Sequence, residues 1–189
     1  MRLAGVILAG GQSSRMGQDK ALVRLDGRSL IAHVMSSLKP QVEALLINSN
    51  ADPARFAEFD CPVLPDCIPG QPGPLAGILT GLLWAKQAGA THILSAPCDI
   101  PGLPPDIGRR FSRALTSSGA EIAIVRDEAG PQPTIGLWPV GLAGRLRHDL
   151  LIRDLRGMQA WLRQFPVAEA ACPRLANINT PQELLAAMV

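Results

Sequence analysis

Short apolar runs alternate with segments of helical periodicity along the whole chain. The apolar runs predict strands at Leu3–Leu8, Val42–Ile47, Val63–Leu64, Thr91–Ala96, Ala120–Val125 and Thr134–Trp138. Apolar residues spaced by three and four predict helices at Ser29–Leu38, Leu75–Ala88, Pro104–Ser117, Gly141–Leu151, Met158–Phe165 and Pro181–Met188. Strands that are apolar along most of their length are buried on both faces. The pattern therefore predicts an α/β protein whose mainly parallel sheet carries helices on both faces.

Polar residues follow four of these predicted strands. A loop that begins at Gly10 follows the first strand, Asn48 the second, Asp66 the third and Asp99 the fourth. In open α/β sheets, ligands bind outside the carboxyl ends of the strands. We therefore expect these four positions to converge on one edge of the sheet, where they form a single site.

The loop after the first strand has the composition of a phosphate-binding loop. Gly10 and Gly11 are adjacent, so backbone N–H groups can approach phosphate oxygens without an intervening side chain. Arg15 and Lys20 add positive charge for a polyphosphate. The spacing does not match a Walker loop, in which a lysine follows the second glycine directly. The alternative is an ordinary strand-to-loop turn with a solvated cationic tip.

Asp99 is the best candidate for a metal ligand. Its carboxylate follows an apolar strand and lies between Pro97 and Pro101, which fix its position. Magnesium prefers oxygen ligands and commonly uses one or two carboxylates together with water and substrate phosphates. The alternative is that Asp99 caps the turn that follows it.

Composition narrows the class of protein. A chain of 189 residues is typical of a single domain, and its net charge of +2 does not favour a nucleic-acid-binding protein. No apolar run is long enough to span a bilayer, and the first is too short for a signal peptide, so we expect a cytoplasmic protein without membrane contact. Four cysteines without C-x-x-C spacing indicate reduced, mostly buried thiols and not a zinc site.

Several motifs together resemble the molybdenum cofactor guanylyltransferases, a family of nucleotidyltransferases. The first motif, LAGGQSSRMGQDK, spans residues 8–20. The resemblance continues, in the same order and over nearly the full length, at Gly73–Gly77, Pro97–Pro101, Pro133–Thr134 and Asn177–Pro181. The first motif alone indicates only a nucleotidyltransferase, whereas the set is more specific.

The resemblance implies a Rossmann-like fold and the transfer of GMP from GTP to the phosphate of molybdenum-bound molybdopterin, with release of pyrophosphate. It implies Mg²⁺ as cofactor and, as further partners, proteins that deliver the cofactor or mature molybdoenzymes. It also implies that Asp99 binds both magnesium and GTP. The remaining GTP contacts that it implies are the backbone of Leu8, Ala9 and Gly10, and the residues Lys20, Asn48 and Asp66.

The reaction itself can be considered from elementary chemistry. An ionised phosphate is already a nucleophile, so nucleotidyl transfer needs positioning and charge neutralisation but no serine, cysteine or histidine base. We therefore assign Gly10 and Gly11 to the phosphates, Arg15 and Lys20 to charge neutralisation, and Asp99 to the metal. In a single domain, the nucleotide-binding half is expected at about 1–100 and the acceptor-binding half at about 101–189.

The base and the acceptor remain open at this point. Guanine presents N1–H and an amino group, and the oxygens of Asp66 or Asn48 could accept from them. Arg156, Trp161 and residues 177–180 are candidates for the pterin, although core packing is the favoured interpretation for Trp161 and a helix cap for Thr180. The alternative functions are a cytidylyltransferase, a sugar-phosphate nucleotidyltransferase, or a regulatory nucleotide-binding protein with a degenerate site.

Overall fold

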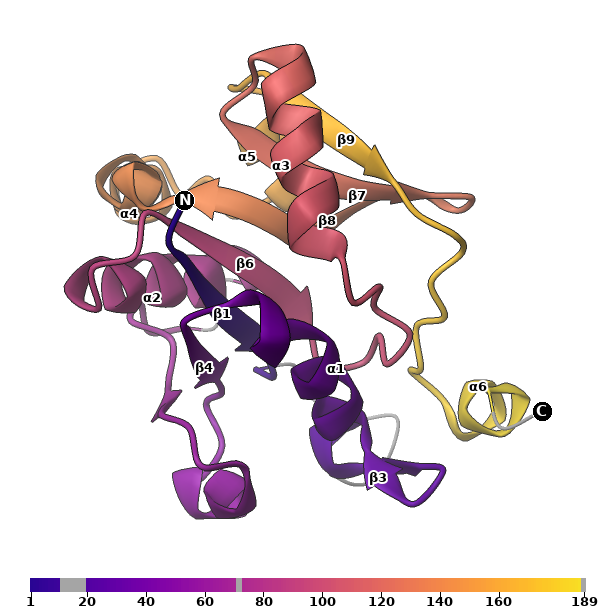
Figure 1. Ribbon diagram of the computed structural model, residues 1–189. Helices are drawn as coiled ribbons and strands as arrows, with labels where there is room; N and C mark the ends of the chain where they lie inside the picture. Colours follow the sequence, from indigo (N-terminus) through magenta and orange to yellow (C-terminus); the bar gives the residue numbers. More distant parts are fainter. Residues whose placement is uncertain (11–19, 71–72, 188–189) are drawn as a thin grey trace.

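A seven-stranded sheet forms the centre of the computed structural model, which describes residues 1–10, 20–70 and 73–187 (Figure 1). The strand order is β5-β4-β1-β6-β8-β7-β9. Among the described pairings within this sheet, those of β8 with β6 and with β7 are antiparallel and the others are parallel, so the predicted mainly parallel sheet is confirmed. The strands are β1 (Leu3–Leu8), β4 (Ala44–Asn48), β5 (Val63–Leu64), β6 (His92–Pro97), β7 (Ile122–Asp127), β8 (Gly130–Pro139) and β9 (Val167–Ala171).

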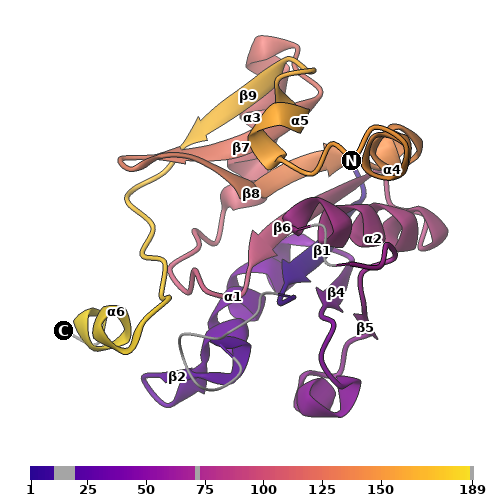
Figure 2. The same cartoon turned by 180° about the vertical axis from the view of Figure 1, so that it is seen from behind.

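Helices cover both faces of the sheet, as predicted. One face carries α1 (Leu30–Leu38) and α3 (Ile107–Ser118), which are seen in Figure 1. The other carries α2 (Pro74–Gln87), α4 (Ala143–Leu151) and α5 (Met158–Leu162), which face the viewer in Figure 2. The last helix, α6 (Pro181–Ala186), lies away from the sheet. Short 3-10 helices are η1 (Lys20–Leu22), η2 (Lys39–Gln41), η3 (Pro53–Phe59) and η4 (Val140–Leu142).

The strands are apolar because each of them contributes side chains to two hydrophobic cores, one on each face of the sheet. In β1, Val6 packs in the core under α2, whereas the next residue, Ile7, packs in the core under α1 and α3. Both side chains are fully buried. Alternate residues of a strand point to opposite faces, so a sheet covered twice requires apolar residues at consecutive positions.

Three parts of the fold differ from the prediction. The edge strand β9 was not predicted, because its sequence VAEAA alternates between buried and exposed positions and lacks a long apolar run. The helix expected to continue to Phe165 ends at Leu162. A hairpin of β2 (Arg24–Leu25) and β3 (Arg28–Ser29) was also missed, since strands of two residues are too short to show a period.

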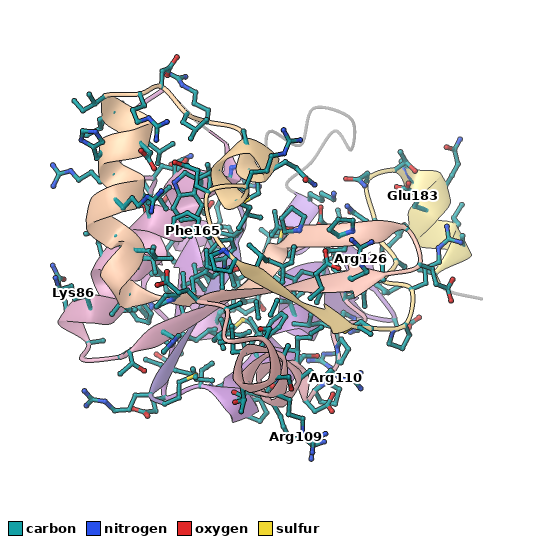
Figure 3. All side chains as sticks on the ribbon, turned by 90° about the horizontal axis from the view of Figure 1, so that it is seen from above. Lys86, Arg109, Arg110, Arg126, Phe165 and Glu183 are labelled. Atoms are coloured by element: carbon teal, nitrogen blue, oxygen red, sulfur yellow. The ribbon has the colours of Figure 1, made fainter. Side chains whose placement is uncertain are left out.

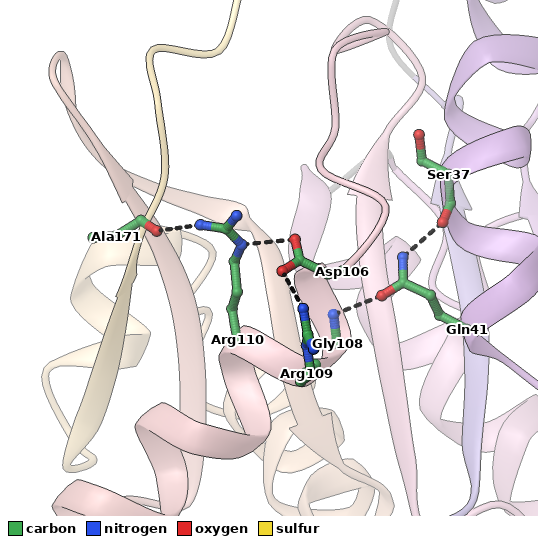
Figure 4. Close-up of polar contacts among 7 residues, drawn as sticks. All are labelled: Ser37, Gln41, Asp106, Gly108, Arg109, Arg110 and Ala171. Carbon is green, nitrogen blue, oxygen red and sulfur yellow. Dashed lines mark hydrogen bonds and ion pairs between the residues drawn. The ribbon is translucent and has the colours of Figure 1, made fainter.

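A polar contact joins the two helices on one face of the sheet (Figure 4). Gln41, which follows α1, accepts a hydrogen bond from the backbone N–H of Gly108 in α3 at 2.8 Å. Asp106 accepts from Arg110, whose guanidinium also donates to the carbonyl of Ala171 at the end of β9. The hydrogen bond from Arg110 is the main cause that lowers the pKa of Asp106. These contacts fasten α3 to both halves of the sheet.

The structure tests two expectations from composition, the absence of a membrane span and the burial of the cysteines. No helix in the described part of the chain is long and apolar enough to cross a membrane. Cys98 is buried, while Cys61 and Cys172 are half-buried. Cys67, which lies on a surface loop beyond β5, is exposed. The expectation of mostly buried thiols is therefore wrong, because one of the four cysteines is buried.

Candidate functional site

The carboxyl ends of four parallel strands meet at one edge of the sheet. Leu8, the last residue of β1, pairs with Asn48 on one side and with Pro97 on the other. Asn48 in turn pairs with Leu64 at the end of β5. The four predicted positions therefore share this edge, as expected from the strand alternation. They form two groups of contacts, one on each side of β1.

The first group, which we call the amide–carboxylate cluster, consists of Asn48, Asn50 and Asp66. Asn48 is almost fully buried, and its Nδ2 donates to the carbonyl of Leu64 at 3.2 Å and to Asp66 Oδ1 at 3.1 Å. Asn50 Nδ2 donates to Asp66 Oδ2 at 2.9 Å, and Asn50 Oδ1 accepts from the backbone N–H of Asp66 at 2.8 Å. The Asp66 carboxylate is thus held at both oxygens by amide groups from the end of β4.

Glycine at position 77 allows α2 to approach this cluster. A Cβ at Gly77 would lie 2.2 Å from Asn48 Oδ1 and 2.8 Å from Leu8 Cδ2, closer than atoms can pack. A Cβ at Gly10 would lie 3.7 Å from Asn50 Nδ2, so the glycine that begins the predicted phosphate loop borders the same cluster. The N–H of Ala9 donates to the carbonyl of Asn48 at 2.8 Å. That amide is therefore engaged within the fold.

The second group, the lysine–carboxylate cluster, consists of Lys20, Asp99 and Asn179. Lys20 Nζ lies 2.5 Å from Asp99 Oδ2 and also donates to Asn179 Oδ1. The side chains of Lys20 and Asp99 are 14% and 17% exposed, so the ion pair is largely withdrawn from water. Among the described residues, Asp99 Oδ1 is buried and has no hydrogen-bond partner. A buried carboxylate oxygen without a donor is costly unless a ligand completes it.

The C-terminal segment, residues 172–187, brings Asn179 to this position. The N–H of Ile178 donates to the carbonyl of Asp99 at 3.0 Å, which joins the two chain segments directly. The side chain of Ile178 is fully buried against Val23, Leu25 and Leu30 near the β2–β3 hairpin. The segment therefore crosses from the acceptor-binding half predicted from sequence to residues next to Lys20.

Asp127 fastens the start of the C-terminal segment to the β7–β8 hairpin. Its Oδ2 accepts from the N–H of Leu175 at 3.1 Å, and its Oδ1 accepts from the N–H of Ala129 at 2.9 Å. The hydrogen bond from Leu175 is the main cause that lowers the pKa of Asp127, against the effect of burial. The ionised carboxylate thus stabilises the route that the C-terminal segment takes.

Thr180 forms a capping box at the start of α6. Its hydroxyl accepts from the N–H of Glu183 at 3.2 Å, and Glu183 Oε2 accepts from the N–H groups of Thr180 and Asn179 at 2.9 and 2.6 Å. The helix-capping alternative for Thr180 is confirmed. Glu183 lies on α6 at the rim of the molecule (Figure 3), and its contact with Asn179 holds the backbone next to the lysine–carboxylate cluster.

Trp161 lies in the core, which confirms the packing alternative for this residue. It is fully buried, its Nε1 donates to Asp149 Oδ2 at 3.0 Å, and its ring lies 4.6 Å from that of Phe165. Phe165 is seen beside α4 in Figure 3. Arg156, another candidate for the pterin, is exposed and pairs with Asp154. Neither residue belongs to the two clusters.

Sequence reasoning assigned some of these residues and missed others. Gly11 and Arg15 lie outside the described residues. Asn50 was missed, although its place two residues after Asn48 puts it on the same strand end. Asn179 was considered only for the pterin, and the structure brings it to Lys20. No signal in the sequence indicated that contact, because 159 positions separate the two residues.

Known proteins resemble this chain in sequence and in fold. Residues 5–170 match the model of the MobA-like NTP transferase domain. The molybdenum cofactor guanylyltransferase of Bradyrhizobium sp. (strain ORS 278) is 40% identical over 188 residues, which cover 95% of this chain and 89% of the relative. The enzyme of that name from Cereibacter sphaeroides is 43% identical over 188 residues, with coverage of 97% and 94%.

A solved structure supports the fold. The crystal structure of molybdopterin-guanine dinucleotide biosynthesis protein A from Archaeoglobus fulgidus superimposes with a TM-score of 0.76. The alignment covers 98% of this chain and 96% of that one, at 21% sequence identity. Together with the matching domain model, this likeness confirms the predicted Rossmann-like nucleotidyltransferase fold.

Proposed function

The chain belongs to the molybdenum cofactor guanylyltransferases, and we propose that it transfers GMP from GTP to the phosphate of molybdenum-bound molybdopterin. The products are the molybdopterin guanine dinucleotide cofactor and pyrophosphate. The observation that carries the proposal is the meeting of Lys20 with Asp99 at the sheet edge where α/β proteins bind their ligands.

The nucleotide contacts proposed from sequence lie along this edge. In the proposed complex, Asp66 and Asn48 meet the nucleoside, because the amide–carboxylate cluster borders Gly10 and the start of α2. The phosphates lie over the loop that begins at Gly10, with Lys20 beside them. The proposed nucleotide contacts on described residues are Leu8, Ala9, Gly10, Lys20, Asn48, Asp66 and Asp99. The N–H of Ala9 is engaged by Asn48, so the backbone contact proposed for Ala9 would be made by its carbonyl, which accepts from the Ser49 hydroxyl at 3.4 Å and has a second lone pair.

The surroundings of Asp99 fit a magnesium ion. Asp99 offers a buried carboxylate oxygen that has no partner among the described residues. The described part of the chain contains no group of three or more His, Cys, Asp and Glu side chains that could hold a metal. This suits Mg²⁺, which often takes one or two carboxylates and completes its octahedron with water and substrate phosphates. When bound, the ion would neutralise charge on the phosphates of GTP.

The proposed catalysis relies on orientation and charge. The acceptor phosphate is already ionised and attacks the α-phosphorus of GTP in line, the bond to the pyrophosphate oxygen breaks, and no general base is needed. Lys20 provides an ammonium group at the place where negative charge accumulates, and its position is set by Asp99 and Asn179. Arg15 is proposed for the same task. The two residues that contact Lys20 are themselves held in place, because the N–H of Ile178, next to Asn179, donates to the carbonyl of Asp99. Lys20 can therefore keep one position for this role.

We propose a single domain in which residues of about 1–100 bind the nucleotide and residues of about 101–189 bind the acceptor. Asn179 joins the two parts, because it belongs to the second half by sequence and contacts Lys20 of the first. Residues 177–180 therefore remain candidates for contact with the pterin.

Pyrophosphate release tests the proposal. The protein is incubated with Mg²⁺ and molybdenum-bound molybdopterin, with GTP in one reaction and CTP in another. We expect release with GTP that requires both the acceptor and Mg²⁺. Release with CTP alone would transfer the assignment to a cytidylyltransferase, and tight GTP binding without release would favour a binding protein.

A further inference from the structure

Asn50 holds Asp66 at two points and has no place in the site assigned from sequence. Its Nδ2 donates to Asp66 Oδ2 at 2.9 Å, while its Oδ1 accepts from the N–H of Asp66 at 2.8 Å. One amide side chain thus binds both the backbone and the side chain of the same aspartate. This double contact fixes the torsion angles of Asp66, which a single hydrogen bond would leave freer.

Asn48 completes the arrangement from the other side of the carboxylate. It donates to Asp66 Oδ1 at 3.1 Å, so each carboxylate oxygen receives one amide N–H. The two donors come from residues that lie two apart at the end of β4, and together they define the plane of the carboxylate. A carboxylate has about four acceptor sites, of which the amides use two. Asp66 is only half-buried, so the remaining sites can serve a ligand.

The position of Asn50 links this arrangement to the nucleotide. A Cβ at Gly10 would lie 3.7 Å from Asn50 Nδ2 and 3.9 Å from Asn48 Oδ1. Both amides therefore border the first glycine of the proposed phosphate loop. The cluster is adjacent to that loop and does not belong to a remote part of the surface.

We infer that Asn50 is a positioning residue for nucleotide recognition: with Asn48, it holds the Asp66 carboxylate in the orientation that accepts two adjacent hydrogen-bond donors of the nucleoside. The inference rests on the proposed function, in which Asp66 contacts GTP. The donor pair is either N1–H and the amino group of guanine or the two ribose hydroxyls. Either pair suits the two oxygens of one carboxylate.

Two substitutions of Asn50 have different consequences. Asn50→Ala removes both contacts, so the Asp66 side chain is no longer held in the free protein. Nucleotide binding must then fix its orientation, and this cost raises the Kd for GTP about ten-fold. Asn50→Asp keeps the shape but replaces the donor with a carboxylate oxygen next to Asp66 Oδ2. It weakens binding further at neutral pH. Affinity then recovers as the pH falls, because the paired carboxyl groups take up a proton.

Direct binding measurements test the inference on the full chain, with Mg²⁺ present and no acceptor. The Kd is determined by calorimetry for wild type, Asn50→Ala, Asn50→Asp and Asp66→Ala. Gln87→Ala, which removes an exposed amide at the end of α2, is the matched control and should leave the Kd unchanged. Each protein is titrated with GTP, with inosine triphosphate, which lacks the 2-amino group, and with 2′-deoxyGTP. Denaturant unfolding verifies that every variant is folded.

We expect Asn50→Ala to raise the Kd for GTP relative to wild type, and to raise the Kd for one of the two analogues by a smaller factor. Shrinkage with inosine triphosphate identifies the base edge as the partner of Asp66, and shrinkage with 2′-deoxyGTP identifies the ribose. Equal losses with all three nucleotides, or a pH-independent loss for Asn50→Asp, would overturn the inference. If Asp66→Ala weakens GTP binding and Asn50→Ala does not, only the inference is wrong. If Asp66→Ala itself binds GTP normally, the assignment of Asp66 in the proposed function is wrong as well.

Discussion

The two clusters at the sheet edge differ in how the chain brings them together. In the amide–carboxylate cluster, the residues come from the ends of two neighbouring strands, and Asp66 is 18 positions from Asn48 and 16 from Asn50. In the lysine–carboxylate cluster, Lys20 is 79 positions from Asp99 and 159 from Asn179. The first cluster depends on the pairing of β4 with β5. The second depends on a C-terminal segment that has left the sheet.

The two clusters are therefore held in place by different parts of the fold. The first cluster is fixed by strand register and by the close approach of α2 at Gly77. The second is fixed by a few contacts of the C-terminal segment, at Asp127, at the backbone of Asp99 and in the small core around Ile178. Local opening occurs most readily where few apolar contacts hold a segment. We therefore expect perturbations of the C-terminal segment to reach the lysine–carboxylate cluster alone.

The largest effect is expected for Asp99→Asn. It removes the charge that pairs with Lys20 and the carboxylate proposed for the metal, and keeps the shape of the side chain. By analogy with the loss of one transition-state contact elsewhere, turnover should fall by about two to three powers of ten. Pyrophosphate release at saturating Mg²⁺ measures it. Glu121→Gln, an exposed carboxylate on the surface, is the control, and unchanged turnover of Asp99→Asn would refute the metal role.

Gly77→Ala should disrupt the amide–carboxylate cluster. The added methyl group would lie 2.2 Å from Asn48 Oδ1, so α2 or Asn48 must move, and the free energy of unfolding should fall by about 3 kcal/mol. Denaturant unfolding measures the loss. Gly144→Ala in α4 is the matched control, since a Cβ there meets nothing within 4 Å, and it should stabilise the protein by a few tenths to about 1 kcal/mol. Equal effects of both changes would contradict the packing argument.

Asp127→Asn should loosen the C-terminal segment. An amide has a single oxygen and can accept from only one of Leu175 and Ala129, so one N–H loses its partner, and the cost reaches about 2 kcal/mol if that N–H is the buried one of Leu175. Because folding lowers the pKa of Asp127, its stabilisation is present above the unfolded pKa and is lost as the pH falls through the lower folded value. Unfolding at several pH values should therefore show wild type and variant converging below about pH 4. A constant difference would argue against the ionised carboxylate.

Sequence periodicity predicted the sheet and its covering helices well, because those elements bury long apolar stretches. It located Asn48, Asp66 and Asp99 at strand ends, because it predicted where the strands end. These residues became site candidates because ligands of open α/β sheets bind at the carboxyl ends of the strands. It missed β9, whose exposed Glu169 interrupts the apolar pattern at the sheet edge. Edge strands are exposed on one side, so their composition is less distinctive.

The contact between Lys20 and Asn179 could not be predicted for a different reason. The motif around Asn179 contains a capping box, and local sequence accounts for the start of α6. Local sequence does not determine where that helix lies. Its place follows from the burial of Ile178 against Val23 and from the hydrogen bond between Ile178 and Asp99, which are tertiary contacts between distant segments. Periodicity describes faces of single elements and carries no information on such pairs.

The smallest effect is expected for Thr180→Ala, which tests whether the C-terminal segment behaves as a separate unit. Loss of the cap should cost α6 about 1 kcal/mol, because the N–H of Glu183 loses its acceptor. Leu184 and Ala187 pack on the small core around Ile178 and on neither of the two cores of the sheet within the described chain, so hydrogen exchange should accelerate in residues 179–187 while the global unfolding midpoint changes little. The same experiment with Ser49→Ala at the end of β4 should accelerate exchange around Asn48 and leave α6 unchanged. Exchange that accelerates at both clusters in either variant would mean that the two parts of the site open together, and the contrast between them would fail.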